Sequence, residues 1–314
     1  MANENLEVCL EYYAKMRIGA IFATYNRSSA LVKTLNAIAS CNTLPDEIVI
    51  VDQSSKVCPE LFSILKQFGE RGLLLRQSQP NAQKARNSAA QKTTADILLF
   101  LDDDILPSQD LIIRHLENYR DASIQAVAGF YTEPGEAESH ELRPVVWWRP
   151  LTKIEKVPAF YNKRVDSPLW PSCNGSIRKE VFMAIGGFDE RFEYTLFDDT
   201  DLSVRMLRAG YRCVHDPSAR LVHLKEPSGG NRPVRPEDEV IAPRARWGNW
   251  VYFFLINWGI LGLGELYYRL RTHVFRRPYF QQPRLFLKAF AEFVVGSFLG
   301  LKMLSKGRKL AQFN

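Results

Sequence analysis

The sequence offers little support for a disulfide framework or a zinc site. Its five cysteines are odd in number, and no two of them form a C-x-x-C pair. Both kinds of site depend on cysteines that pair or cluster. We therefore expect reduced, mostly buried thiols at the five positions, which are Cys9, Cys41, Cys58, Cys173 and Cys213.

Two common nucleotide-binding loops are also missing. The sequence contains neither a G-x-G-x-x-G fingerprint nor a Walker A loop, so dinucleotide and P-loop chemistry have little support. It also lacks a glycine-rich, arginine-containing loop near its start. A sugar-1-phosphate nucleotidyltransferase would need such a loop to hold a triphosphate.

The first 17 residues lack a continuous apolar run, because Glu4, Glu7 and Glu11 interrupt them. We therefore expect neither a secretory signal nor an N-terminal membrane anchor, and a protein whose bulk stays in the cytosol. Internal repeats and low-complexity stretches are not evident either. With 314 residues and 46% hydrophobic content, the chain can bury one large core.

Charge is unevenly distributed between two parts of the chain. Residues 241–314 contain 12 Lys and Arg against 2 Asp and Glu, a net charge of +10, whereas the whole chain has +6 and residues 1–240 therefore have −4. We expect a catalytic domain over 1–240 and a basic, apolar helical region over 241–314. Such a region suits nucleic acid or an anionic membrane, and its apolar content favours the membrane over nucleic acid.

Apolar runs rich in Ile and Val recur through the first 130 residues. Continuous rather than alternating hydrophobicity indicates strands that are covered on both faces, as in a parallel sheet. Segments with helical spacing, such as 28–40 and 108–119, lie between the runs. The sequence thus predicts an α/β fold with a mostly parallel sheet flanked by helices. The expected strands are 18–23, 48–51, 73–75, 97–101 and 126–130.

Three consecutive carboxylates, Asp102, Asp103 and Asp104, follow the expected strand 97–101. They repel one another unless a cation or a hydrogen-bond network neutralises them, and Mg²⁺ or Mn²⁺ prefers oxygen ligands. Alternatively, Asp104 caps the helix that follows. His223 comes after another strand-like run and is a candidate second metal ligand, although a histidine among apolar neighbours is more often structural.

A second acidic segment, Asp198-Asp199-Thr200-Asp201, opens the expected helix 199–209. One of these residues could cap the helix while the others favour its positive end. However, a cap requires one residue and this segment has three carboxylates. A carboxylate near a bound sugar donor could act as the general base that deprotonates an acceptor hydroxyl.

Basic and amide side chains open another expected helix at residues 80–88. Asn81, Lys84 and Arg86 would meet a diphosphate there, or they would simply lie on a solvated helix start.

In combination, these motifs resemble the family 2 glycosyltransferases of the GT-A fold, particularly the bacterial rhamnosyltransferase-like and polysaccharide-assembly members. The resemblance spans roughly residues 17–230 and depends on the order of seven strings rather than on any one. They are T-Y-N-R at 24–27, V-D-Q-S-S at 51–55, P-N-A-Q-K-A-R-N at 80–87, F-L-D-D-D at 100–104, N-G-S-I-R at 174–178, G-G-F-D-E at 186–190 and F-D-D-T-D-L-S-V-R at 197–205.

The resemblance implies an inverting, metal-dependent transfer from a nucleotide sugar, and a role for each matching position. Asp104 and His223 would hold Mn²⁺ or Mg²⁺, and Asp199, or its neighbour Asp198, would be the catalytic base. The remaining matches would bind substrate. Asp52 would contact the nucleotide base, with the loop of Thr24, Tyr25, Asn26 and Arg27 beneath it, and Arg86 would lie near the diphosphate. Asp102 with Asp103 would contact the ribose side, and Asn174 with Gly175 would lie near the donor or acceptor.

The sequence departs from the family pattern at two places. Gln53 stands where a second acidic residue often follows Asp52, which weakens the assignment of the base and ribose contacts. The usual Glu-Asp pair is here Asp198-Asp199, so the choice of base between these two neighbours depends on position alone.

The C-terminal region predicts amphipathic helices that lie in a membrane interface. Eighteen uncharged residues separate Arg246 from Glu265, which is barely enough to span a bilayer, and several are Trp, Gly or Asn. Around 284–294 an apolar face alternates with charges at every fourth residue. We expect in-plane attachment at the cytoplasmic face. Packing on the catalytic domain, or on a second subunit of a homo-oligomer, is the alternative.

These observations leave two classes of function open. The first is an inverting glycosyltransferase that acts on a lipid-linked or polysaccharide acceptor. The second is a catalytically silent glycan-binding or scaffold protein of a polysaccharide assembly complex, which would not need Asp104, Asp199 and His223 together. Trp147, Trp148 and Trp170 could stack on an acceptor sugar or lie in the core.

Overall fold

The computed structural model describes residues 16–56, 58–135, 143–144, 155–156, 159–192, 197–226, 230 and 242–313. Trp147, Trp148 and the expected boundary between residues 240 and 241 lie outside these ranges, as does about half of the proline-rich stretch 133–171. In that stretch the structure shows short strand pairings at β7 (Arg143–Pro144), β8 (Glu155–Lys156) and β9 (Val165–Asp166).

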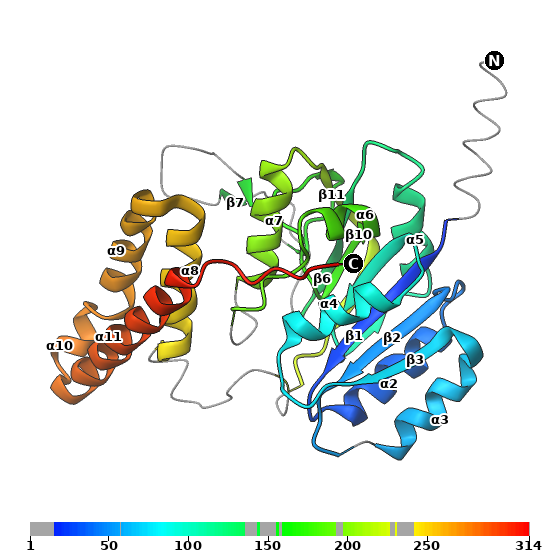
Figure 1. Ribbon diagram of the computed structural model, residues 1–314, viewed down its shortest axis with the longest axis horizontal. Coiled ribbons are helices and arrows are strands. Elements are labelled where there is room, and N and C mark those ends of the chain that lie inside the picture. The colour runs from blue at the N-terminus through cyan, green and yellow to red at the C-terminus, as the bar shows by residue number, and fades with distance from the viewer. Residues whose placement is uncertain are drawn as a thin grey trace.

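The first part of the chain alternates strands and helices, as the sequence predicted (Figure 1). All five expected strands are present. The elements in chain order are β1 (Ile18–Thr24), α2 (Ser28–Ala39), β2 (Glu47–Asp52), α3 (Pro59–Gln67), β3 (Gly72–Arg76), α4 (Ala82–Lys92), β4 (Ile97–Leu101), β5 (Ile105–Pro107), α5 (Leu111–Asn118) and β6 (Ala126–Thr132).

One mixed sheet organises this part of the molecule, with the order β3-β2-β1-β4-β10-β6-β11-β5 and with β9 beside β11. Strands β1 to β4 are mutually parallel, and β6 is parallel to β11 (Cys213–His223). Strand β10 (Asn174–Arg178) inserts antiparallel between β4 and β6. The predicted mostly parallel sheet is therefore confirmed. The strand-like run before His223 is the second half of β11, which has an irregularity in its register between Asp216 and Arg220.

Apolar side chains cover the sheet on both faces, which explains the continuous apolar runs. Ile18, Ala20 and Phe22 pack with α2, α3 and α5 on one face. Ile21 packs on the other face with α4, α6 (Lys179–Ala184) and α7 (Asp198–Arg208). Trp170 belongs to this second layer, at 1% exposure and edge-on to Phe100, and is therefore not available to stack on a sugar.

The C-terminal region forms helices α8 (Arg244–Trp258), α9 (Gly262–His273), α10 (Arg277–Phe280) and α11 (Pro283–Ser305). The uncharged stretch that the sequence analysis singled out is broken at Gly259, whose φ is +55°. Among the described residues, no helix is both long enough and apolar enough to cross a membrane. In Figure 1, these helices lie at the side of the sheet where α7 is found.

Helix α8 is packed against the part of the chain that contains the sheet rather than exposed. Its Trp247, Tyr252 and Phe253 are almost fully buried. Phe253 stacks on Phe197, the residue before α7, with ring centroids 4.4 Å apart. The packing alternative raised from the sequence is therefore confirmed for α8.

Buried polar contacts join the same parts. Asp201 of α7 is fully buried, and it accepts hydrogen bonds from Asn257 at 3.0 Å and Arg308 at 2.5 Å. Beyond α11 the chain returns to the catalytic part, where the Ala311 N–H donates to the Gly186 carbonyl at 3.0 Å and Phe313 packs against Phe182. Residues 242–313 thus share a continuous interior with α7 and α6.

Close packing of α8 on α11 depends on glycine. A Cβ atom added at Gly300 would lie 2.6 Å from both the Gly248 carbonyl oxygen and Val251 Cβ. We expect Gly300→Ala to lower the free energy of unfolding by about 1–3 kcal/mol, since the two backbones must separate, although alanine is the better helix former. Leu301→Ala, at a residue that is 48% exposed, is the control. A thermal melt in which Gly300→Ala is as stable as Leu301→Ala would contradict the close approach.

Candidate active site

A cleft of about 200 Å³ opens where the carboxyl ends of β1, β4 and β6 meet the start of α7. Ligands of open α/β sheets bind at this edge. Many of the predicted site residues line the cleft together: Tyr25, Arg27, Arg86, Asp102, Asp103, Asp198, Asp199 and His223.

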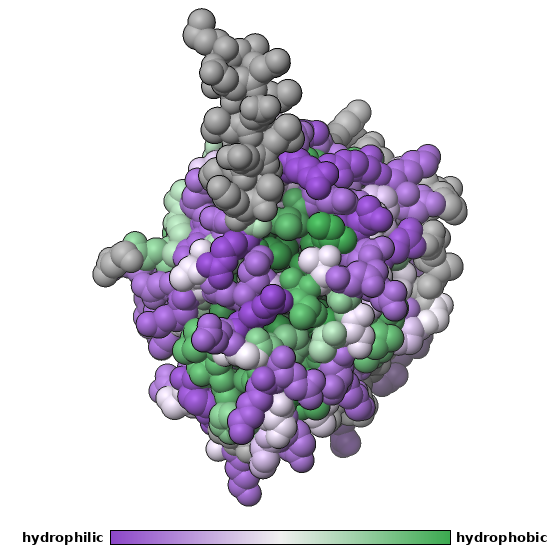
Figure 2. Space-filling model, turned by 90° about the vertical axis from the view of Figure 1, so that its right-hand side faces the viewer, coloured by the Kyte–Doolittle hydropathy of each residue, from purple (hydrophilic) through white to green (hydrophobic). Residues whose placement is uncertain are grey.

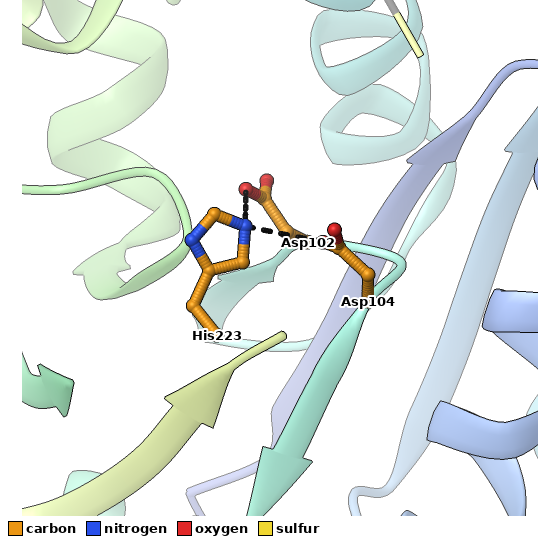
Figure 3. Close-up of side chains that lie close together, drawn as sticks. All are labelled: Asp102, Asp104 and His223. Carbon is orange, nitrogen blue, oxygen red and sulfur yellow. Dashed lines mark ion pairs between the residues drawn. The ribbon is translucent and has the colours of Figure 1, made fainter. Parts of the chain in front are cut away.

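Asp102, Asp104 and His223 offer ligand atoms that all lie within 4.8 Å of one another (Figure 3). The Nε2 atom of His223 is 3.1 Å from Asp104 Oδ1 and 3.5 Å from Asp102 Oδ2. The turn after β4 supplies the two aspartates, and the end of β11 supplies the histidine. Two carboxylates and one imidazole suit Mn²⁺ or Mg²⁺, which take further ligands from water or a bound diphosphate.

The surroundings of Asp104 fit a cation. Its Oδ1 is buried and accepts no hydrogen bond of good geometry from the described residues. Burial acts to raise the pKa of Asp104, but His223, the Glu226 N–H and Arg27 together lower it, so the carboxylate is charged. Because its contact with His223 Nε2 at 3.1 Å lacks good hydrogen-bond geometry, a bound cation would be a further positive partner for this buried oxygen.

Asp103 is not one of these three possible ligands, and it anchors the loop after β1. It accepts a hydrogen bond from the Thr24 hydroxyl at 2.7 Å and pairs with Arg27 at 3.4 Å. Burial raises the pKa of Asp103 to about 7, although Thr24 and Arg27 act against this. Thr24 is almost fully buried and therefore supports the cleft from beneath, whereas Tyr25 and Arg27 face into it.

Arg86 of α4 joins the two acidic segments. Its guanidinium lies 3.2 Å from Asp102 Oδ1 and 3.1 Å from Asp198 Oδ2, and it stacks over Phe188 at 5.6 Å. A guanidinium is always charged and presents several donors in one plane, so it can bind two carboxylates while it lines the cleft. Its predicted position beside a diphosphate is compatible with this place in the cleft.

The two aspartates at the start of α7 have different surroundings. Asp198 is 3% exposed, and its Oδ2 accepts hydrogen bonds from Gln83 at 3.0 Å and from Arg86. Asp199 is half-buried, and its Oδ1 accepts from the Thr200 N–H at 2.7 Å. Burial, followed by the Asp198 carboxylate, raises the pKa of Asp199 above the usual range. Asp198 is thus held in an ion pair, whereas the pKa of its neighbour Asp199 is raised.

Asp52 is fully buried at the end of β2, where its carboxylate pairs with Arg76 and accepts from the Ser54 N–H. The parallel register places Asp52 directly beside Arg76, which explains the pair. The neighbouring Gln53 lines the cleft instead. Asn26 is exposed, and its backbone N–H donates to the Ser54 hydroxyl at 2.8 Å.

Four further residues that were expected to bind substrate lie outside the cleft lining. The Asn81 side chain caps α4 by accepting from the Lys84 N–H at 2.7 Å, and Lys84 itself is exposed outside the cleft lining. Asn174 is fully buried with its amide bonded to His115 and to the carbonyls of Phe130 and Ala219. Gly175 is buried with it because both lie on the inserted strand β10.

Other cleft residues were not singled out from the sequence. Tyr131 ends β6 and Cys173 precedes β10, and both line the cleft. Tyr131 could have been found, because it follows an apolar strand as the other site residues do. The sequence carries no comparable signal for Phe197. This residue has a positive φ of +69°, and it immediately precedes Asp198 and Asp199 on the first turn of α7.

Comparison with known proteins identifies the family. The model of glycosyl transferase family 2 matches residues 20–186, more than half of the chain. The chain belongs to this family. The matched range begins within β1, extends past β10 and includes the first acidic segment, Asp102 to Asp104, whereas α7 and His223 lie beyond it.

Individual relatives share limited sequence identity with this chain. The O-antigen chain rhamnosyltransferase of Salmonella typhimurium is 27% identical over 212 residues, and the match covers 66% of each chain. Glycosyltransferase AglE of Haloferax volcanii is 28% identical over 242 residues, which cover 74% of this chain and 71% of AglE. The N-acetylglucosaminyl-diphospho-decaprenol L-rhamnosyltransferase of Mycobacterium tuberculosis is 40% identical over 58 residues, only 19% of its length.

Two solved structures share the fold. GalNAc-T7 with UDP, GalNAc and Mn²⁺ is similar with a TM-score of 0.59 and 17% identity, and covers 77% of this chain and 48% of its own. A Pyrobaculum calidifontis mannosyltransferase with GDP-Man and Mn²⁺ has a TM-score of 0.50 and 15% identity, and covers 96% of both chains. The predicted GT-A fold is confirmed by these neighbours.

We expect Asp104→Asn to weaken Mn²⁺ binding by about 100-fold or more, since even groups that only support a metal ligand contribute 10–100-fold. Electron paramagnetic resonance of free Mn²⁺ would measure this, with and without a nucleoside diphosphate. Asp166→Asn, at a surface carboxylate that is 69% exposed, is the control. If Asp104→Asn binds Mn²⁺ as the unaltered protein does, the metal site is wrong.

Proposed function

We propose that this protein is an inverting glycosyltransferase that moves a sugar from a nucleoside diphosphate to a hydroxyl of a lipid-linked or polysaccharide precursor. One observation carries the proposal: a possible metal trio, a cleft-lining arginine and an aspartate with a raised pKa share one cleft. Two relatives are named as rhamnosyltransferases, so rhamnose is the sugar we propose. The name of the mycobacterial relative also includes a diphospho-decaprenol acceptor.

Each residue has a role in a single displacement. Asp104, His223 and Asp102 would hold a divalent cation, which when bound would offset the negative charge of the diphosphate. Arg86 would contact the same diphosphate from the other side of the cleft. Asp199 accepts the proton of the acceptor hydroxyl as its oxygen bonds to the anomeric carbon and the bond to the diphosphate breaks. Asp198 keeps Arg86 in place through their ion pair.

We expect the purified full chain to release nucleotide from one donor in a panel of UDP-, GDP- and dTDP-sugars with Mn²⁺ or Mg²⁺, and to stop on chelation. Asp199→Asn should lower the rate by about 10²–10⁴, the usual contribution of a general base, without weakening donor binding to the same extent. Binding of no nucleotide sugar by the unaltered chain would refute the transferase proposal.

The pH dependence of the same reaction tests the base. Asp199 must be deprotonated to accept a proton, so the rate should fall as the pH drops through its raised pKa, well above the value of about 4 for an ordinary aspartate. Asp198→Asn removes a nearby negative charge and should shift this midpoint to lower pH. An unchanged midpoint would indicate that the group seen in the profile is not Asp199.

We further propose that helices α9 to α11 rest on the cytoplasmic face of a membrane. Of 17 large apolar side chains exposed among the described residues, 13 lie between Ile260 and Leu301, including Tyr267 and Phe298. The face that looks away from these helices is largely hydrophilic around a central apolar strip (Figure 2). An apolar helix face with basic flanks is typical of in-plane attachment to anionic lipids.

We expect the full chain to float with anionic liposomes, and Phe298→Asp to weaken this binding by about tenfold or more, because burying a phenylalanine contributes about 1.5–3 kcal/mol. Phe62→Asp on α3 makes the same change at a side chain that is 50% exposed and should have no effect. A point variant is preferable to truncation, since α8 and residues 308–313 belong to the shared interior. If both variants float equally and the unaltered chain is a dimer that Phe298→Asp dissociates, the apolar face serves self-association instead.

A further inference from the structure

A second cavity, of about 370 Å³, lies where the C-terminal helices meet the catalytic part of the chain. Helix α8 forms one wall with Gly248 and Asn249, and the last turns of α11 form another with Lys302 and Lys306. The catalytic part contributes the segment 190–191 and Asn81. The volume is within the usual range for small-ligand sites.

The charges around this cavity do not balance. Lys309 is paired with Glu190 at 2.9 Å, and Arg191 donates to the backbone carbonyls of Lys306 and Gly307. No carboxylate of the described residues lies within ion-pair distance of the Lys302 or Lys306 ammonium. Two lysine side chains that line a cavity without a counterion favour an anionic ligand, and lysine is a common phosphate binder.

The cavity adjoins the active-site cleft. Asn81 lines the cavity and the next residue, Ala82, lines the cleft. The backbone N–H of Asn81 also donates to the side-chain carbonyl of Gln53, which lines the cleft, at 2.5 Å. The cavity and the cleft therefore meet the same short segment, residues 81–82.

The cavity also adjoins the exposed apolar face of α11. Leu299 lines the cavity and is 38% exposed, and its neighbour Phe298 is 70% exposed. An anionic group in the cavity could thus continue into a hydrocarbon chain along α11 on one side and into a sugar at the cleft on the other.

We propose that this cavity binds the phosphate groups of a lipid-linked acceptor, with Lys302 and Lys306 as the phosphate contacts. The inference rests on the proposed transfer to a lipid-linked acceptor, and it identifies where such an acceptor is held. The shared chemistry is a phosphate at a membrane surface, which either a lipid-linked diphosphate or a phospholipid headgroup would supply.

The test measures binding of the full chain to phosphatidylcholine vesicles that contain a polyprenyl diphosphate, phosphatidylglycerol at the same surface charge, or the uncharged matching polyprenol. We expect preference for the diphosphate over the other two. The double variant Lys302→Ala/Lys306→Ala should weaken diphosphate binding by about tenfold or more, since each basic residue near an anionic surface contributes about 1 kcal/mol. Arg284→Ala/Lys288→Ala removes two charges from the same helix outside the cavity lining and is the matched control.

Equal losses in the two double variants would overturn the site, because general surface charge would then explain the binding. A loss confined to Lys302→Ala/Lys306→Ala, with phosphatidylglycerol bound as well as the diphosphate, would support a phosphate site and assign it to a lipid headgroup. Nucleotide release without acceptor should be unchanged in both variants. The proposed transferase activity is therefore tested separately. If that activity is absent, the unaltered chain releases no nucleotide. If only the phosphate site is wrong, the unaltered chain still releases nucleotide.

Discussion

The arrangement of the cleft depends on the ion pairs of Arg86 with Asp102 and Asp198. The turn after β4 and the start of α7 each present consecutive carboxylates to one small space, where they would repel one another. A buried guanidinium between them makes the two segments compatible, and removal of one partner of a buried pair usually costs several kcal/mol. Because the same side chain lines the cleft, it holds the site together and remains available to a diphosphate.

The C-terminal helices contribute to this arrangement through α7. Phe197 adopts a left-handed backbone conformation just before Asp198 and Asp199, and its ring stacks on Phe253 of α8. One helical turn further, Asp201 is bound by Arg308 and Asn257. A strained residue persists where its surroundings determine its position. Helix α8 and residue 308 thus contact the helix that carries the proposed base, although they are distant from it in the sequence.

Much of the fold followed from the sequence, because the apolar runs of β1 to β4 and β6 need two covered faces. The structure also brings Asp104 and His223 together, as expected for residues at the ends of strands that run in the same direction. The sequence could not show that Asn174 turns into the core, which depends on the antiparallel insertion of β10. It could not separate Asp198 from Asp199 either, because Gln83 and Arg86 approach from another helix.

The return of the chain to Gly186 and Phe182 has a consequence for how the protein acquires its structure. Phe313 packs against Phe182 of α6 in the apolar layer on one face of the sheet, although the two residues are more than a hundred positions apart in the sequence. Contacts of such long range form late and slow folding, since a large loop must close first. A fragment limited to the family-matched residues 20–186 would leave Phe182 without this cover, so the recognisable catalytic segment and the cooperative unit of folding are not the same length of chain.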